Sequence, residues 1–262
     1  MTDPLIQQAL AGQPLSCFVV DSHAHIGECF FPVIDPTADA LVRAMDRCGV
    51  DVAVANSTPG CLAARIPEGN DEIIDAVRRF PTRILGMAAI NPHRPDQSLD
   101  ELKRCRDAGL IGIKTHDYIG VAYDDPRYDF AWQFAHDHRW PILLHTWGQT
   151  HLHALRPRFA EYQAVRWILG HAGAADRQAY LEAARDFPNV YLEIAASACP
   201  RGLIQYFVES GAEDRVLYGS DAVFMDMAPQ LGRVVFAQIP LQAKLKILSQ
   251  NAQTLFPLNP PD

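Results

Sequence analysis

Short apolar runs alternate with amphipathic segments along almost the whole chain. Eight of these runs are rich in valine, isoleucine and leucine and lack polar alternation, which is typical of strands buried on both faces of a parallel sheet. They cover residues 18–25, 50–57, 84–90, 110–115, 141–145, 165–171, 190–195 and 215–221. Because the spacing of their starts matches one strand–helix unit, the pattern predicts an α/β fold, a (β/α)8 TIM barrel in a single domain.

The segments between the runs predict helices. These cover residues 36–48, 71–80, 98–108, 128–138, 175–187 and 203–210, with one more inside 151–163 and helical material over 231–256. Gly49 and Gly109 follow two of them, as expected where a helix ends in a left-handed residue. Residues 1–16 are predicted to be a lead-in with one helical turn, and residues 17–262 to form the barrel. An open doubly wound sheet would need a glycine-rich nucleotide-binding sequence after the first run, which the chain lacks.

Composition narrows the class of partner. The 262 residues carry a formal net charge of −8, so the chain lacks the basic excess that binding to nucleic acid or an anionic membrane requires. The sequence has neither an export signal nor an apolar stretch long enough to span a membrane, which predicts a soluble cytoplasmic protein. Six scattered cysteines without C-x-x-C spacing fit reduced thiols. We expect a small-molecule substrate, and a homo-oligomer is compatible with the sequence.

Polar residues capable of metal or proton chemistry stand at the ends of the predicted strands. They are His23, His25, Lys114, His116, His145, His171, Glu193 and Asp221. In a barrel these carboxyl ends converge on one basin. Alternation along a strand places His23 and His25 on the same face. Each residue alone is more often an ordinary strand-end polar group than a ligand, but the set predicts a metal site.

Six motifs together resemble the amidohydrolase superfamily, in particular its amidohydrolase-related branch of metal-dependent hydrolases and decarboxylases. They are Asp21–His25, Gly112–His116, Pro141–Thr146, Ile168–Gly173, Leu217–Asp221 and Asn251–Phe256, in the family's order. The resemblance implies that His23, His25, His145 and Asp221 hold a divalent metal, usually zinc. It also implies that His171 acts beside the metal on water or substrate, with Asp221 as the other catalytic residue.

The chemistry of these side chains agrees with that assignment. Three neutral imidazoles and one carboxylate suit Zn²⁺ and leave a coordination position open, while Mn²⁺ and Fe²⁺ are compatible as well. Asp21 and Ser220 are candidates for orienting the ligating rings, although both are equally well explained as ordinary polar residues.

Lys114 leaves two arrangements open. In the less favoured one, a carboxylated Lys114 bridges two metals, and His145 and His171 hold the second. In the favoured one, a single metal is bound and Lys114 binds a substrate carboxylate, with a structural pairing to Glu193 as the alternative. His116 and Trp147 are predicted to line the substrate pocket.

The loops after the strands are expected to set substrate specificity. Phe30, Phe31, Tyr118, Tyr123 and Trp147 offer apolar walls, and Arg65, Arg94 and Arg201 offer anion contacts. The leading prediction is a hydrolase that uses metal-activated water to open an ester, lactone or amide bond of a small carboxylate-bearing substrate. A non-oxidative decarboxylase on the same scaffold is the alternative. A non-catalytic metal-binding protein is a third reading. A barrel deoxyribonuclease is disfavoured because Lys114 stands where a metal-binding glutamate would be expected.

Overall fold

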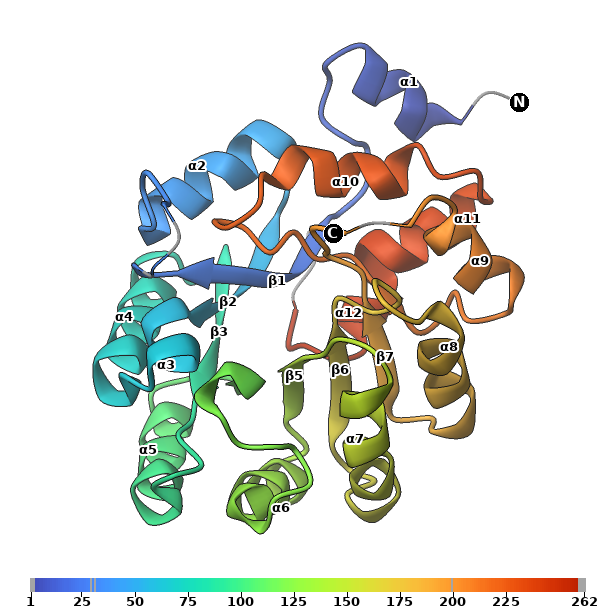
Figure 1. The fold of residues 1–262 in the computed structure, drawn as a ribbon. Helices are drawn as coiled ribbons and strands as arrows, with labels where there is room; N and C mark the ends of the chain where they lie inside the picture. Colours follow the sequence, from blue (N-terminus) through green and yellow to red (C-terminus); the bar gives the residue numbers. More distant parts are fainter. Residues whose placement is uncertain (1–2, 29, 31, 199, 259–262) are drawn as a thin grey trace.

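Eight parallel strands pair in sequence order and curve into a barrel with helices outside it (Figure 1). The computed structural model describes residues 3–28, 30, 32–198 and 200–258. The strands are β1 (Val20–Ile26), β2 (Val52–Ser57), β3 (Ile84–Ala89), β4 (Gly112–Thr115), β5 (Pro141–His145), β6 (Arg166–Gly170), β7 (Val190–Glu193) and β8 (Val216–Leu217). The predicted barrel is therefore confirmed, and each strand falls within or beside its predicted run.

The last strand returns to the first. The amide of Ser22 donates to the carbonyl of Tyr218 at 2.9 Å, and the amide of Asp221 donates to the carbonyl of His23 at 2.8 Å. These bonds hold the residues that follow β8 against β1, so the predicted ligands of the first and eighth strands become neighbours.

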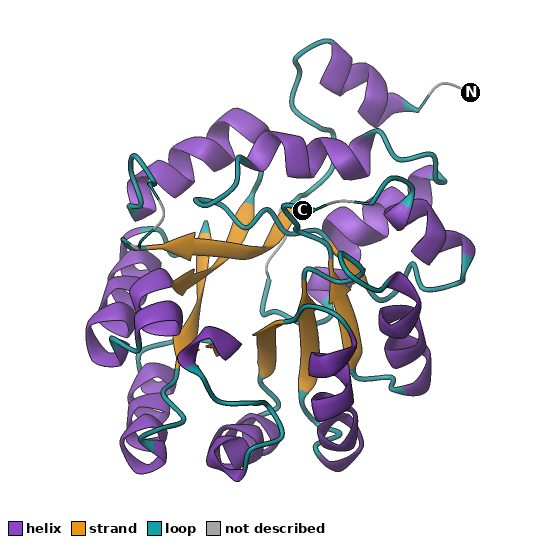
Figure 2. Ribbon diagram, in the orientation of Figure 1, coloured by secondary structure: helices purple, strands orange, loops and turns teal. Residues whose placement is uncertain are grey.

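Helices separate the strands and cover the outside of the sheet (Figure 2). They are α1 (Pro4–Leu10), α2 (Ala38–Cys48), α3 (Thr58–Ala63), α4 (Ile66–Arg79), α5 (Pro95–Asp107), α6 (Asp129–His138), α7 (Gln149–Glu161), α8 (Arg177–Asp186), α9 (Leu203–Glu209), α10 (Met227–Val235), α11 (Leu241–Leu245) and α12 (Asn251–Gln253). Short 3-10 turns occupy Asp117–Ile119 and Pro126–Tyr128, and a π-helical segment, η3, occupies Lys246–Gln250. No helix in these described ranges is long and apolar enough to cross a membrane.

Local sequence explains where α2 begins and ends. The Thr37 hydroxyl accepts the Ala40 amide at 3.2 Å and caps the first turn. Gly49 ends the helix with φ of 68°, and its amide donates to the carbonyl of Met45. A glycine tolerates this left-handed conformation without the clash that a Cβ would cause, which confirms the prediction for this position.

Three regions differ from the sequence prediction. Helical material expected over 231–256 is interrupted between α10 and α11, because Pro240 cannot continue a helix and stands at the N-cap of α11. From there α11, η3 and α12 follow one another without a gap. The final strand is only Val216–Leu217, because the chain then bends, and Asp221 has a left-handed φ of 58°. The short helix α3 was not predicted.

An apolar layer fills part of the barrel interior. Val20, Val54, Met87, Leu143, Ile168 and Leu217 pack together with Ala252, Leu255 and Phe256 from the C-terminal segment. A larger apolar cluster lies between the strands and the surrounding helices. The strands are thus fixed from both sides.

Candidate active site

The two histidines of β1 point into the same space, as alternation predicts. Their Nε2 atoms lie 3.1 Å apart, and both side chains are buried. Burial lowers the pKa of His23 well below its ordinary value and that of His25 to about 4, although hydrogen bonding to Asp221 opposes the shift for His25. Both rings are therefore neutral near pH 7, which is the protonation state in which an imidazole binds a metal.

Asp221 meets the β1 histidines after the chain leaves β8. Its Oδ1 lies 3.1 Å from Nε2 of His25 and 3.5 Å from Nε2 of His23. The hydrogen bond from its amide to the His23 carbonyl fixes this approach. Burial alone would raise the pKa of Asp221, but His25 and the neighbouring positive charges hold it below the ordinary value. Three predicted ligands thus converge.

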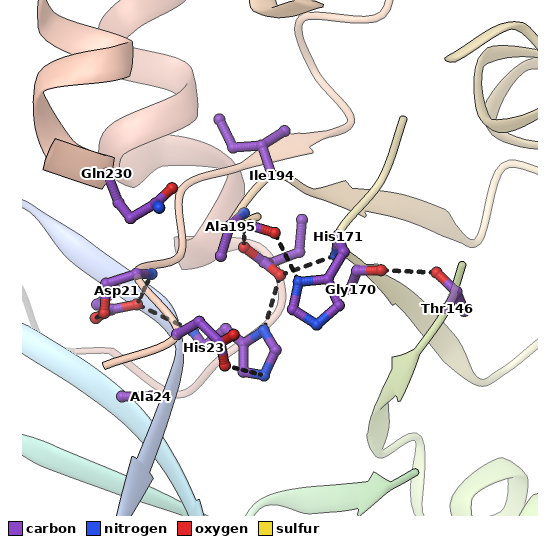
Figure 3. Close-up of polar contacts among 12 residues, drawn as sticks. Asp21, His23, Ala24, Thr146, Gly170, His171, Ile194, Ala195 and Gln230 are labelled. Carbon is purple, nitrogen blue, oxygen red and sulfur yellow. Dashed lines mark hydrogen bonds and ion pairs between the residues drawn. The ribbon is translucent and has the colours of Figure 1, made fainter. Parts of the chain in front are cut away.

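His171 also faces this centre (Figure 3). It follows β6 with a left-handed φ of 61°, and its Nδ1 donates to the carbonyl of Ala195 at 2.7 Å. One donor atom each from His23, His171 and Asp221 lie within 4.8 Å of one another, a grouping that fits a divalent metal ion. The buried ring borders the cavity through its free side.

His145 lies in a neighbouring group rather than in that trio. Its ring stacks on His116, with centroids 3.8 Å apart and planes 15° apart. Asp117 Oδ1 lies 3.0 Å from His116 Nδ1 and 4.0 Å from His145 Nε2. Nearly parallel stacked rings cannot both direct a lone pair at one ion, because each lone pair lies in the plane of its own ring. Asp117 lies on the Nε2 side of His145, so Nδ1 of that ring is left for a different partner.

A third histidine holds Asp117 in place. The His151 Nδ1 accepts the Trp147 amide at 2.7 Å, so its Nε2 carries the proton and donates to Asp117 Oδ2 at 3.0 Å. Burial would raise the pKa of Asp117, but the hydrogen bond from His151 and the closeness of the His116 ring keep it far below the ordinary value. The sequence placed Asp117 and His151 only within the loops after the fourth and fifth strands that were expected to set specificity, and it assigned neither a role.

Lys114 is buried at the centre of the site, with 1% of its surface exposed. Its Nζ lies 2.9 Å from Nε2 of His23. Burial lowers its pKa from the ordinary lysine value. The predicted alternative partner Glu193 instead contacts the opposite nitrogen of His23, at 2.8 Å. Lys114 borders the cavity, as do His116 and Trp147.

Asp21 and Ser220 contact each other rather than an imidazole ring. Asp21 Oδ2 lies 2.5 Å from the Ser220 hydroxyl, and Asp21 Oδ1 accepts the amides of Ser220 at 2.9 Å and His23 at 3.1 Å. Burial raises the pKa of Asp21 to about 7, against the effect of these hydrogen bonds. These hydrogen bonds join the backbone at His23 to the backbone next to Asp221. The pair therefore positions both predicted ligands through the main chain and does not contact their side chains.

A cavity of about 1100 Å³ opens above these groups. Phe30, Tyr118, Trp147 and Phe224 supply aromatic walls, and Phe30 stacks on Tyr118 with centroids 5.5 Å apart. Tyr123, expected to be a wall, is instead buried below and donates to the His145 carbonyl at 2.8 Å. Phe31 lies outside the described residues.

The arginines at the edge of the cavity are not the ones predicted. The cavity is bordered by Arg43 and Arg47 of α2, while Arg65, Arg94 and Arg201 do not line it. The arginines expected at the cavity lie in the loops after the strands, whereas the two arginines that border it lie on adjacent turns of α2. Arg43 pairs with Asp35 at 2.6 Å.

Comparison with known proteins gives a family and a set of relatives. A family model described as Amidohydrolase matches residues 20–258. A gamma-resorcylate decarboxylase from Polaromonas sp. is 26% identical over 288 residues, covering 84% of this chain and 87% of that protein.

Solved structures share the fold. A dihydroxybenzoic acid decarboxylase from Polaromonas sp., with bound manganese and the inhibitor 2-nitroresorcinol, matches with a TM-score of 0.73 at 21% identity, covering 92% of this chain and 97% of that one. A probable 2-pyrone-4,6-dicarboxylic acid hydrolase from Acinetobacter baumannii matches with a TM-score of 0.70 at 18% identity, covering 90% and 98%. Since the family model spans nearly the whole chain and the barrel carries the expected strand-end residues, this chain belongs to the amidohydrolase family.

Proposed function

We propose that this protein is a metal-dependent, non-oxidative decarboxylase of a small aromatic carboxylic acid. The observation that carries the proposal is the cavity whose floor is formed by His23, His25 and Asp221 and whose walls are aromatic. The similarity to a gamma-resorcylate decarboxylase favours this activity over the hydrolysis expected from sequence.

A divalent ion fits the donor set found here. Nε2 of His23 and His25 and Oδ1 of Asp221 lie within 3.5 Å of one another, and neutral imidazoles with one carboxylate are borderline ligands. We propose His145 as the fourth ligand, since Asp117 faces its far nitrogen, as carboxylates do behind metal-bound histidines. Zinc is the metal expected from the ligand types, and manganese is the alternative.

The ion would supply a Lewis acid that binds an oxygen of the substrate. The chain's own residues would bind the substrate and exclude water. Lys114 and the stacked His116 are placed to contact the substrate carboxylate, and Trp147 and the other aromatic walls hold a planar ring. The apolar walls also exclude water from the leaving carboxylate.

Loss of CO₂ requires one proton. The bond between the ring carbon and the carboxylate breaks, its electron pair stays on that carbon, and the carbon takes up a proton as CO₂ leaves. We propose that Nε2 of His171 takes up this proton from solvent and delivers it to the carbon, because Nδ1 already carries the proton donated to the Ala195 carbonyl and the ring borders the cavity.

A product assay tests the proposal. Protein loaded with manganese or zinc is offered 2,6-dihydroxybenzoate and related hydroxybenzoates, and released CO₂ is measured beside hydrolysis of lactone and ester substrates. We expect CO₂ release, which Asp221→Asn abolishes. Hydrolysis without CO₂ release would favour the hydrolase reading, and neither activity with stoichiometric metal would favour a non-catalytic protein.

A further inference from the structure

Glu193 ends β7 inside the protein and contacts both sides of the site. Its side chain is wholly buried. One carboxylate oxygen lies 2.8 Å from His23 Nδ1 and accepts the His171 amide at 3.4 Å, while the other oxygen accepts the amide of Ala195. A single acidic group thus joins strands β1, β6 and β7 beneath the proposed metal.

The contact with Glu193 determines which nitrogen of His23 carries a proton. Both oxygens of Glu193 accept backbone amides, as an ionised carboxylate does, although burial raises the pKa of this group. An ionised carboxylate only accepts hydrogen bonds, which assigns the proton to Nδ1 of His23. Nε2 of the same ring then keeps its lone pair. The contact on the opposite nitrogen is consistent with this tautomer, because Nζ of Lys114 lies 2.9 Å from Nε2 of His23 and can donate to it.

Glu193 reaches His171 through Ala195. The amide of Ala195 donates to Glu193, and the carbonyl of Ala195 accepts Nδ1 of His171 at 2.7 Å (Figure 3). His171 therefore also carries its proton on Nδ1 and directs Nε2 toward the cavity.

The surrounding chain leaves space for this carboxylate. A Cβ added at Gly219 would overlap the Glu193 carboxylate and lie 2.9 Å from the Cβ of His23. At Gly170 an added Cβ would lie 3.7 Å from the carboxylate and 2.8 Å from the Leu144 carbonyl. Two glycines at strand ends thus border the position of Glu193.

We propose that Glu193 is a positioning residue that fixes both His23 and His171 as Nδ1–H tautomers, so that both present Nε2 to the metal and the substrate. The inference rests on the proposed metal site for its effect on metal affinity. The tautomers themselves are measurable in metal-free protein, which separates this inference from the proposed function.

The first experiment uses the unaltered chain. Long-range ¹H–¹⁵N spectra of the metal-free protein report which nitrogen of each imidazole is protonated. We expect His23 and His171 as Nδ1–H tautomers. A proton on Nε2 of His23 would overturn the proposal, because Glu193 would then be a neutral acid donating to that ring.

The second experiment replaces the hydrogen-bond acceptor that faces His23 Nδ1 with a donor. In Glu193→Gln the amide oxygen must face the Ala195 amide, since that donor is fixed, so the NH₂ group faces His23 Nδ1. We expect His23 to change to the Nε2–H tautomer and Mn²⁺ affinity to fall about 10- to 100-fold. Glu209→Gln, an exposed change on α9, should alter neither. Unchanged tautomer and affinity in a folded Glu193→Gln protein would overturn the proposal.

Discussion

Replacing His171 by asparagine is the substitution that isolates proton transfer. His171 has a left-handed φ of 61° and is buried at 6% exposure. Asparagine adopts that conformation more readily than most residues, and its amide can still donate to the Ala195 carbonyl that now accepts Nδ1. The loss in stability should therefore not exceed that of one hydrogen bond, about 1 kcal/mol, which would lower Tm by at most about 2–4 °C.

Turnover should respond far more strongly than stability. A positioned acid or base contributes about 10²- to 10⁴-fold to a rate, equivalent to about 2.7–5.5 kcal/mol of activation free energy. We expect His171→Asn to lose that factor in kcat while retaining metal. The assay combines metal analysis, thermal unfolding and CO₂ release on the same preparation, with the exposed His153→Asn of α7 as the control.

Three outcomes separate the accounts of His171. Turnover within a few-fold of the parent, with metal retained, would refute proton transfer by this residue. Loss of metal together with turnover would make His171 a ligand, as its closeness to His23 and Asp221 permits. A large drop in Tm with unchanged turnover per folded molecule would make its role structural.

Three further predictions concern other parts of the chain. His145→Asn should reduce bound metal below half of the parent value in elemental analysis, and full retention would exclude it as a ligand. Asp3→Asn should lower unfolding free energy by about 3 kcal/mol in chemical denaturation, because the buried Lys244 ammonium loses its partner at 2.5 Å. The pKa of Asp3 is lowered by Lys244, against burial, so this contribution is present at neutral pH and lost as pH falls through that lowered pKa; a parent–variant difference that persists in stronger acid would contradict it. Gly219→Ala should weaken Mn²⁺ binding, and an unchanged Kd would show that the carboxylate of Glu193 can move aside.

Much of the fold could be predicted because burial on both faces leaves an unbroken apolar run in the sequence. The pairing of His23 with His25 followed from alternation alone. The approach of Asp221 did not, since it depends on a left-handed residue beyond the short β8. The helix α3 was missed because Pro59 and Gly60 weaken every local helical pattern.

The supporting contacts of the site could not be predicted from the sequence. Glu193 and His23 are 170 residues apart, and His151 and Asp117 are 34 apart, so no local periodicity links either pair. Closure of the barrel brings Glu193 to His23, and the pairing of β4 with β5 brings His151 to Asp117. Strand-end position indicated which residues share the basin, but it carried no information on which ring nitrogen faces which partner.

Decarboxylation is tested most directly by following the fate of the carboxylate and of the incoming proton together. Metal-loaded protein is incubated in D₂O with 2,6-dihydroxybenzoate labelled with ¹³C in the carboxylate. We predict one ¹³CO₂ per turnover and a product with one deuterium on the carbon that lost it. Consumption of the labelled acid with its ¹³C-carboxylate carbon retained in the product would contradict decarboxylation.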